Sequence, residues 1–287
     1  MTGIKEKFKK KISPFRQFIY KNTGRKPWSY GYIDTKWVDI NSTINNGKSL
    51  NAFKDGSIPQ KFGIGYDERI VEYPWIFSHL KSSEKSSILD AGSTFNFKEI
   101  VEHPNIKNKE LTIYTYYPES ENFINNRISY VFGDLRSLPF KTNLYDEIVC
   151  QSTIEHVDMD NSIYGYNLEP NTESTKKSFE YLKVVDELIR VLKSRGQLLL
   201  TFPYGQFENH GFFQQFDEEM VKKITDTMNQ SGTLTKEFII YSKNGWRFDS
   251  QENCNNSVSY NPHTGKGKGE DGAAHCRCVC CIKFIKN

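Results

Sequence analysis

Between residues 87 and 202 the chain alternates short apolar runs with segments of helical periodicity. Five runs predict strands: 87–90, 111–117, 128–132, 147–151 and 197–202. The stretch Ser178–Leu192 places leucine, valine and isoleucine at helical spacing between the last two runs. Strands that alternate with helices predict an α/β fold with a doubly wound, mostly parallel sheet.

The C-terminal third continues the pattern differently. Asp217 precedes a polar segment with Met220 or Val221, Ile224 and Met228 on one side, which predicts a capped helix. Two further apolar runs, 238–241 and 274–284, have no helical pattern between them. Strands connected without a helix pair antiparallel most simply, so a seven-stranded sheet with an antiparallel C-terminal hairpin is expected.

The N-terminal third carries fewer signals. A helix is expected over Asp67–Leu80, bent or divided at Pro74, and the Gly, Asn and Ser residues of 41–56 predict a loop. We therefore predict an N-terminal extension over residues 1–60 and one domain over 61–287. Within the domain, the long polar segment 158–177 is expected to be a lid or a specificity insertion.

Charge is distributed unevenly along the chain. Residues 1–26 hold nine basic side chains and one acidic side chain, a net +8, so the total of +3 leaves −5 for the remainder. The same segment carries an apolar stripe at helical spacing. The stripe consists of Ile4, Phe8, Ile12, Phe15 and Ile19. Such a helix either packs on its own domain, which we favour, or makes a peripheral contact with an anionic membrane surface.

Composition excludes several protein classes. Apolar residues make up 37% and charged residues 25% of the chain, as in ordinary globular proteins. No apolar run approaches the roughly 18 residues of a membrane span. The N-terminus lacks the features of a signal peptide, so a cytoplasmic protein is expected. The basic charge is confined to the arm, so we expect no nucleic-acid partner.

Clusters of aromatic and cysteine residues have simple structural explanations. Trp28, Tyr30, Tyr32 and Trp37 either line a pocket or pack against the domain, and packing is the expectation. The cysteines near the C-terminus crowd one predicted strand, where neighbouring side chains point to opposite faces. Buried thiols without a metal or disulfides are therefore expected. These cysteines are Cys276, Cys278, Cys280 and Cys281.

Polar groups follow three of the predicted strands. Asp90-Ala-Gly92 ends the first strand, Asp134 follows the third, and Glu155-His156 follows the fourth. Ligands of parallel sheets bind at the carboxyl ends of the strands. These groups predict one binding site at that edge.

The motifs resemble those of class I S-adenosylmethionine-dependent methyltransferases, closest to the type 11 group. Four segments carry the resemblance, in the family's order: 88–92, 133–140, 145–157 and 190–203. The resemblance implies S-adenosyl-L-methionine as cofactor. It places the turn Asp90-Ala91-Gly92-Ser93-Thr94 at the methionine part of the cofactor, Asp134 and Leu135 at the adenine, and Gln151 on the other side of the cofactor.

Two features depart from the family pattern. Thr94 and Asn96 stand where the family usually has its second and third glycines. The second strand also lacks the usual acidic residue at its end; Thr115 stands there and Glu119 follows. The ribose is then held by Glu119 or by a hydroxyl group, or the cofactor is bound weakly.

The resemblance suggests methyl transfer to a small acceptor, with a sugar or polysaccharide hydroxyl as the first choice. His156 is the preferred general base, with Glu155 orienting it or binding substrate, and His210 is the competing base. Acidic residues of 158–177 could hold a divalent ion, but a solvated loop is favoured and no metal is expected. The alternatives are a non-catalytic binding protein with this fold and a C- or N-methyltransferase.

Overall fold

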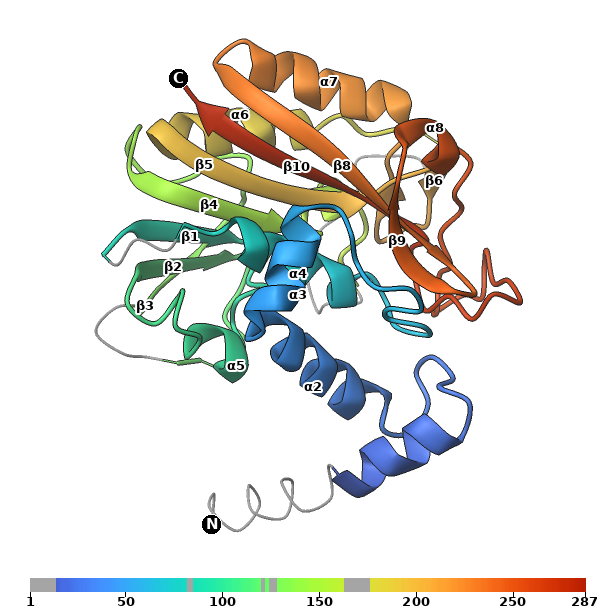
Figure 1. Ribbon diagram of the computed structural model, residues 1–287. Coiled ribbons are helices and arrows are strands. Elements are labelled where there is room, and N and C mark those ends of the chain that lie inside the picture. The colour runs from blue at the N-terminus through green and yellow to red at the C-terminus, as the bar shows by residue number, and fades with distance from the viewer. Residues whose placement is uncertain (1–13, 82–84, 120–121, 124–127, 163–175) are drawn as a thin grey trace.

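A computed structural model describes residues 14–81, 85–119, 122–123, 128–162 and 176–287. Its centre is an eight-stranded sheet with the order β3-β2-β1-β4-β5-β10-β8-β9 (Figure 1). The strands are β1 (Ser87–Ala91), β2 (Glu110–Thr115), β3 (Ile128–Phe132), β4 (Tyr145–Gln151), β5 (Leu192–Pro203), β8 (Gly232–Ser242), β9 (Gly245–Asp249) and β10 (Cys278–Lys286). A separate pair, β6 (Glu208–Asn209) and β7 (Gln214–Gln215), follows β5.

The pairing directions confirm the expected α/β fold. β3, β2, β1, β4 and β5 pair in parallel, and β10 pairs antiparallel with both β5 and β8. The predicted number of seven strands was wrong, because β9 adds an eighth strand antiparallel to β8. β5 begins at Leu192, five residues before the predicted start at 197, and pairs with β4 through a register shift.

Helices cover both faces of the sheet (Figure 1). Each face has its own apolar core between the sheet and the helices. The helices α2 to α5 share a core with one face, and α6 and α7 share a core with the other. The helices are α2 (Tyr32–Ile44), α3 (Gly47–Lys54), α4 (Arg69–His79), α5 (Lys98–Val101), α6 (Tyr181–Val191), α7 (Glu218–Asn229) and α8 (Gln251–Cys254). As predicted, Asp217 caps α7 by accepting a hydrogen bond from the Met220 amide.

The loop expected over 41–56 is helical. Asn46 caps α3 by accepting a hydrogen bond from the Ser49 amide at 3.0 Å. Phe53 of α3 is buried and packs edge-on against Phe62 and Phe248. Burial of a few large side chains therefore overrides a composition that is typical of loops.

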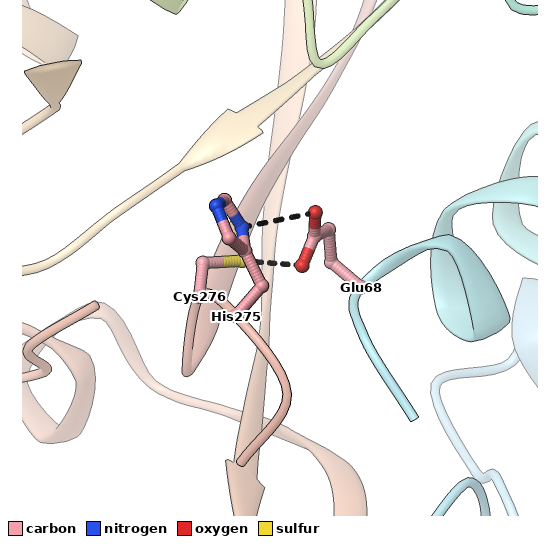
Figure 2. Close-up of side chains that lie close together, drawn as sticks. All are labelled: Glu68, His275 and Cys276. Carbon is pink, nitrogen blue, oxygen red and sulfur yellow. Dashed lines mark hydrogen bonds and ion pairs between the residues drawn. The ribbon is translucent and has the colours of Figure 1, made fainter. Parts of the chain in front are cut away.

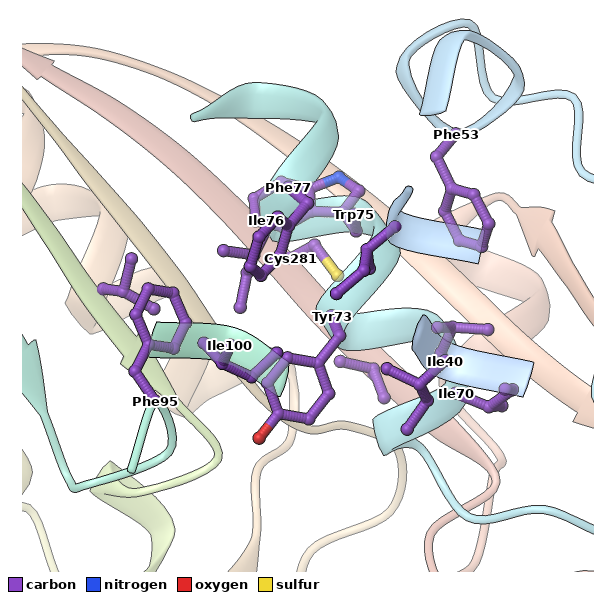
Figure 3. Close-up of a cluster of buried hydrophobic side chains, with 14 of the residues drawn as sticks. Ile40, Phe53, Ile70, Tyr73, Trp75, Ile76, Phe77, Phe95, Ile100 and Cys281 are labelled. Atoms are coloured by element: carbon purple, nitrogen blue, oxygen red, sulfur yellow. The ribbon is translucent and has the colours of Figure 1, made fainter. Parts of the chain in front are cut away.

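Helix α4 fills the core on its side of the sheet (Figure 3). It is not divided at Pro74, and all residues from Ile70 to Phe77 are buried. The Tyr73 hydroxyl donates a hydrogen bond to the Thr94 carbonyl oxygen at 2.5 Å. Through this bond, α4 holds the turn that follows β1.

The N-terminal segment is described from residue 14, where a helix spans 14–22. Of the predicted apolar stripe, Ile4, Phe8 and Ile12 lie outside the described residues, and Phe15 is 61% exposed. Tyr32 packs on Tyr66, so this part of the aromatic cluster packs against the domain as expected. Trp37 likewise contacts the ring of Tyr73.

Candidate functional site

A cavity of about 350 Å³ opens at the carboxyl ends of β1, β2, β3 and β4. Its lining comes from the end of β2, from the segments that follow these four strands and from the first residue of α4. The lining residues are Arg69, Gly92, Thr94, Tyr114, Thr115, Tyr116, Glu119, Gly133, Asp134, Leu135, Arg136, Ser152, Thr153, His156, Val157, Asp158, Met159 and Asn161. The topology thus brings six of the predicted site residues to one cavity. These six are Gly92, Thr94, Thr115, Asp134, Leu135 and His156.

Asp90 shapes the turn after β1 from behind. Its fully buried carboxylate accepts hydrogen bonds from the Thr94 amide at 3.1 Å, the Thr94 hydroxyl at 3.0 Å and the Phe95 amide at 2.7 Å. Burial raises the pKa of Asp90 to about 7, against the opposing effect of these three donors. Ala91 is buried beside it, so neither side chain lines the cavity.

The turn itself needs a glycine at one position. Gly92 has φ +130°, and a Cβ there would lie 2.1 Å from the Thr153 hydroxyl oxygen. Ser93 also has a positive φ, 61°, and its hydroxyl is buried. The backbone at Gly92 can therefore approach a ligand without a side chain between them.

The two missing glycines of the family pattern are replaced by side chains with defined partners. Thr94 bonds to Asp90, as described above. Asn96 donates a hydrogen bond to Glu119 at 2.7 Å and accepts one from the Tyr130 hydroxyl at 3.0 Å. At these two positions hydrogen bonds take the place of glycines, and those of Asn96 also fix Glu119 at the edge of the cavity.

The Asp134 carboxylate is held by its neighbours. It accepts hydrogen bonds from the backbone amide and the guanidinium of Arg136, the shortest at 2.6 Å, and from the Tyr116 hydroxyl at 3.2 Å. Burial pushes the pKa of Asp134 up, but the bonds from Arg136 outweigh it and leave the pKa below its usual value. Arg136 also pairs with Glu180 at 3.2 Å. A further donor to Asp134 would have to displace one of these contacts.

A buried polar network lies behind the wall at β4. Glu72 accepts hydrogen bonds from the Gln151 side chain at 3.3 Å, from the Thr201 hydroxyl at 2.6 Å and from the Ser152 hydroxyl. Gln151 is fully buried, so it supports the wall without lining it. Arg69 pairs with Glu72 at 3.2 Å, and its side chain, 28% exposed, is a cation in the cavity wall.

His156 lies in the short helix Ile154–His156 and lines the cavity. Its Nδ1 lies 2.7 Å from the Phe212 carbonyl oxygen. Because a carbonyl oxygen only accepts, Nδ1 carries the proton and Nε2 carries the lone pair. Burial lowers the pKa of His156 to about 4, so the imidazole is neutral near pH 7. The neutral imidazole of His156 can therefore accept a proton at Nε2.

Glu155, the neighbour of His156, is almost completely buried. Burial raises the pKa of this carboxyl well above its usual value. Its Oε1 lies 3.9 Å from His156 Nε2, beyond hydrogen-bonding distance. Glu155 does not line the cavity, so the structure gives it a position next to the base and no direct place for substrate.

The depressed pKa of His156 predicts a pH-dependent stability. The unfolded histidine binds a proton near pH 6.5, whereas the folded one binds it only near pH 4. Unfolding therefore takes up a proton in this window, and stability that is present above pH 6.5 is lost as the pH falls toward 4. The side chain keeps 22% exposure, so about 3 kcal/mol is an upper limit.

Urea denaturation at pH 7.5, 5.5 and 4.5 measures this effect. The wild type is expected to lose more stability on acidification than the His156→Gln variant, since the other histidines titrate in both proteins. Equal losses in the two proteins would show that the pKa of His156 is not depressed.

His210 lies outside the cavity lining. Its ring stacks on Phe213 with centroids 4.4 Å apart, and its Nε2 lies 3.0 Å from Glu208 Oε2. Burial lowers the pKa of His210 to about 4. The structure therefore does not bring the competing base to the site, although the rings of His210 and His156 both lie near Phe213.

Only some of the acidic residues of 158–177, the candidates for holding a divalent ion, lie in the described part of the chain. Asp158 lines the cavity and accepts a hydrogen bond from the Ser178 hydroxyl at 2.7 Å. Glu169 and Glu173, with most of the expected lid, lie outside the described residues. The possible ion site in this segment thus stays a sequence-based suggestion.

Sequence reasoning missed the cavity's cations and Thr153. Arg69 opens a helix that precedes β1, and no local motif connects it with strand ends downstream. Arg136 follows Asp134 by two residues, a spacing at which a side chain can fold back on its neighbour. The position of Arg136 could therefore have been inferred from the sequence.

Comparisons with known proteins give similar folds only. Neither family models nor curated protein sequences match the chain. Solved structures that resemble it include a SAM-dependent methyltransferase from Methanosarcina mazei, with 14% identity over 74% of this chain and 96% of that one, at a TM-score of 0.42. The N-methyltransferase NodS from Bradyrhizobium japonicum, in complex with S-adenosyl-L-homocysteine, shows 13% identity over 88% and 98% of the chains, with a TM-score of 0.40. The YcgJ protein from Bacillus subtilis shows 12% identity over 72% and 94%, with a TM-score of 0.43.

None of the helices in the described part of the chain combines the length and the apolar character that crossing a membrane requires.

Proposed function

We propose that the chain is an S-adenosylmethionine-dependent methyltransferase that acts on a small acceptor. One observation carries the proposal: the turn at Gly92, the carboxylates of Glu119 and Asp134, and the neutral base His156 all reach one cavity. These groups come from the ends of four parallel strands. They offer partners for a ligand with a charged end, a diol and an aromatic base.

The lining residues suggest how the cofactor is held. The Arg69 guanidinium and the backbone at Gly92 would receive the amino-acid end, since a cation and a close backbone suit a carboxylate. Glu119 or the Thr115 hydroxyl would accept from the ribose, and Asp134 with Leu135 would border the adenine. The bound cofactor supplies a methyl group on a positively charged sulfur.

The acceptor is best argued from the base. Methylating a hydroxyl requires removal of its proton, and a neutral imidazole on the cavity wall can take it. A sugar or polysaccharide hydroxyl is our preferred acceptor, on the resemblance of the sequence motifs. Methylation of nitrogen or carbon in a small molecule is the second possibility, because a neutral amine needs less help from a base.

Calorimetric titration with S-adenosylhomocysteine tests cofactor binding. Binding is expected for the wild type, with affinity lowered about tenfold or more in Asp134→Ala, because this variant removes the carboxylate at the expected adenine position. Asp226→Ala, an exposed aspartate on α7, is the matched control and is expected to bind as the wild type does. No binding at millimolar ligand would contradict the proposal and favour a non-catalytic protein of this fold.

The N-terminal segment supports a second, separate proposal: a peripheral contact with anionic membranes. Phe15 and Phe18 are 61% and 65% exposed, and Trp28 and Tyr30 are about half exposed, all within a basic segment. Apolar side chains beside basic ones suit an anionic lipid surface.

Flotation with phosphatidylserine-containing vesicles measures this contact. The wild type is expected to float and the double variant Phe15→Ser/Phe18→Ser to float at least several-fold less, with neutral vesicles as the control. Equal flotation of the two proteins would contradict a membrane role for these rings.

A further inference from the structure

Three side chains of different ligand types meet where the start of α4 approaches the segment before β10 (Figure 2). Glu68 Oε1 lies 3.2 Å from His275 Nδ1, and Glu68 Oε2 accepts a hydrogen bond from Cys276 Sγ at 3.4 Å. The oxygen, nitrogen and sulfur atoms all lie within 4.8 Å of one another. Glu68 and Cys276 are buried, and the His275 side chain is 16% exposed.

Hydrogen bonds satisfy this cluster only in part. His275 Nδ1 is buried and lacks a hydrogen bond, although Glu68 Oε1 is near it. The neighbouring Glu155 has a buried Oε2 that also lacks a hydrogen bond. Buried polar atoms in native proteins nearly always have partners, and an ion is one kind of partner.

We propose that Glu68, His275 and Cys276 bind a divalent ion of the zinc class. Zinc bonds of about 2.0–2.3 Å in a tetrahedral arrangement separate neighbouring ligand atoms by about 3.3–3.5 Å. The distances from the Glu68 carboxylate, 3.2 Å from Oε1 to His275 Nδ1 and 3.4 Å from Oε2 to Cys276 Sγ, are close to this spacing, with one carboxylate oxygen toward each of the other two ligands. A thiolate and an imidazole select zinc or a similar metal over calcium and magnesium, which prefer oxygen ligands.

The charge of the cluster agrees with such an ion. Binding replaces the proton of the Cys276 thiol, and any proton on His275 Nδ1, by bonds to the metal and releases these protons to solvent. The thiolate and the Glu68 carboxylate then balance the two positive charges, so the buried site becomes neutral. The His275 side chain keeps 16% exposure, so the cluster lies close to the protein surface.

The ion would connect distant parts of the chain. Glu68 and Cys276 are 208 positions apart, and Glu68 directly precedes Arg69 in the cavity wall. We therefore assign the site a structural purpose: it fixes the start of α4 against the start of β10. The assignment is independent of whether the cavity transfers methyl groups.

Cobalt titration of chelator-treated full-length protein tests the site. One equivalent of Co²⁺ is expected to give the near-ultraviolet absorption of a cobalt–thiolate bond and visible bands of a tetrahedral site, and Zn²⁺ is expected to remove both. Excess Zn²⁺ is expected to raise the Tm by about 5 °C. Absence of a thiolate band together with an unchanged Tm would overturn the proposal.

Matched variants identify the ligands. Cys276→Ser is expected to abolish the thiolate band, whereas Cys280→Ser, a buried thiol on β10 in the other core, is expected to retain it. His275→Gln, at a partly exposed position, is expected to lower the affinity for Zn²⁺ at least tenfold, while the exposed His263→Gln leaves it unchanged. If Cys276→Ser does not fold, the comparison of His275→Gln with His263→Gln still tests the site. Equal affinities in that pair would overturn the assignment.

Discussion

Replacing Asp90 by asparagine is expected to lower the affinity for S-adenosylhomocysteine about tenfold or more, although the two side chains have the same shape. The carboxylate accepts three hydrogen bonds in a fully buried position. Asparagine keeps one oxygen for Thr94 but turns an NH₂ group toward the Phe95 amide. Two buried donors then face each other, which costs roughly 1–3 kcal/mol, and each 1.4 kcal/mol is a factor of ten in affinity.

Calorimetric titration together with thermal unfolding measures this effect. Asp146→Asn is the control, because Asp146 bonds to Ser87 at the amino end of the strands and its side chain is 38% exposed. Both variants are expected to fold, and only Asp90→Asn is expected to bind weakly. If the two bind equally well, Asp90 does not hold the turn in its binding conformation.

Replacing His156 by glutamine is expected to lower turnover of a hydroxyl acceptor by about 10²–10⁴-fold, the usual contribution of a general base. Affinity for S-adenosylhomocysteine is expected to change little, since the base removes a proton from the acceptor. His103→Gln, a buried histidine bonded to the Ile44 carbonyl oxygen, is the control for the loss of an imidazole.

The measurement is formation of S-adenosylhomocysteine with acceptors found by screening sugars and amines. For a hydroxyl acceptor, the wild-type rate is expected to fall only as the pH approaches about 4, where His156 gains its proton. Full turnover by His156→Gln with such an acceptor would exclude His156 as the base. Little loss with an amine acceptor would instead favour N-methylation.

The sheet was predictable because buried parallel strands are nearly continuous apolar runs, as 197–202 is. β9 was missed although the sequence contains a hairpin signal. Asn244-Gly245 lies between β8 and alternating apolar residues, and Gly245 has φ +91°. Helices α2 and α3 were harder to predict, because their buried side chains pack against residues distant in sequence, as Phe53 of α3 packs against Phe248.

The sequence motifs identify residues at the ends of strands, and this part of the candidate site was predictable. Asp90 was assigned to the cofactor turn, but its buried position showed that it supports that turn from behind. Arg69 could not be found, since only the tertiary structure brings the start of α4 to the strand ends. Local patterns therefore predict which edge of the sheet binds, and long-range packing decides which side chains meet there.

The pairing of the N-terminal helices with the last strands has a consequence for synthesis on the ribosome. Phe53 packs on Phe248, the Trp246 amide bonds to the Phe62 carbonyl oxygen, and Cys281 lies in the same core as Trp75 (Figure 3). The helices are synthesised before β9 and β10, so these contacts can form only after both strands have been made. During translation the helices stay exposed to chaperones and proteases, so nascent chains halted before β9 are expected to be degraded faster than the complete protein.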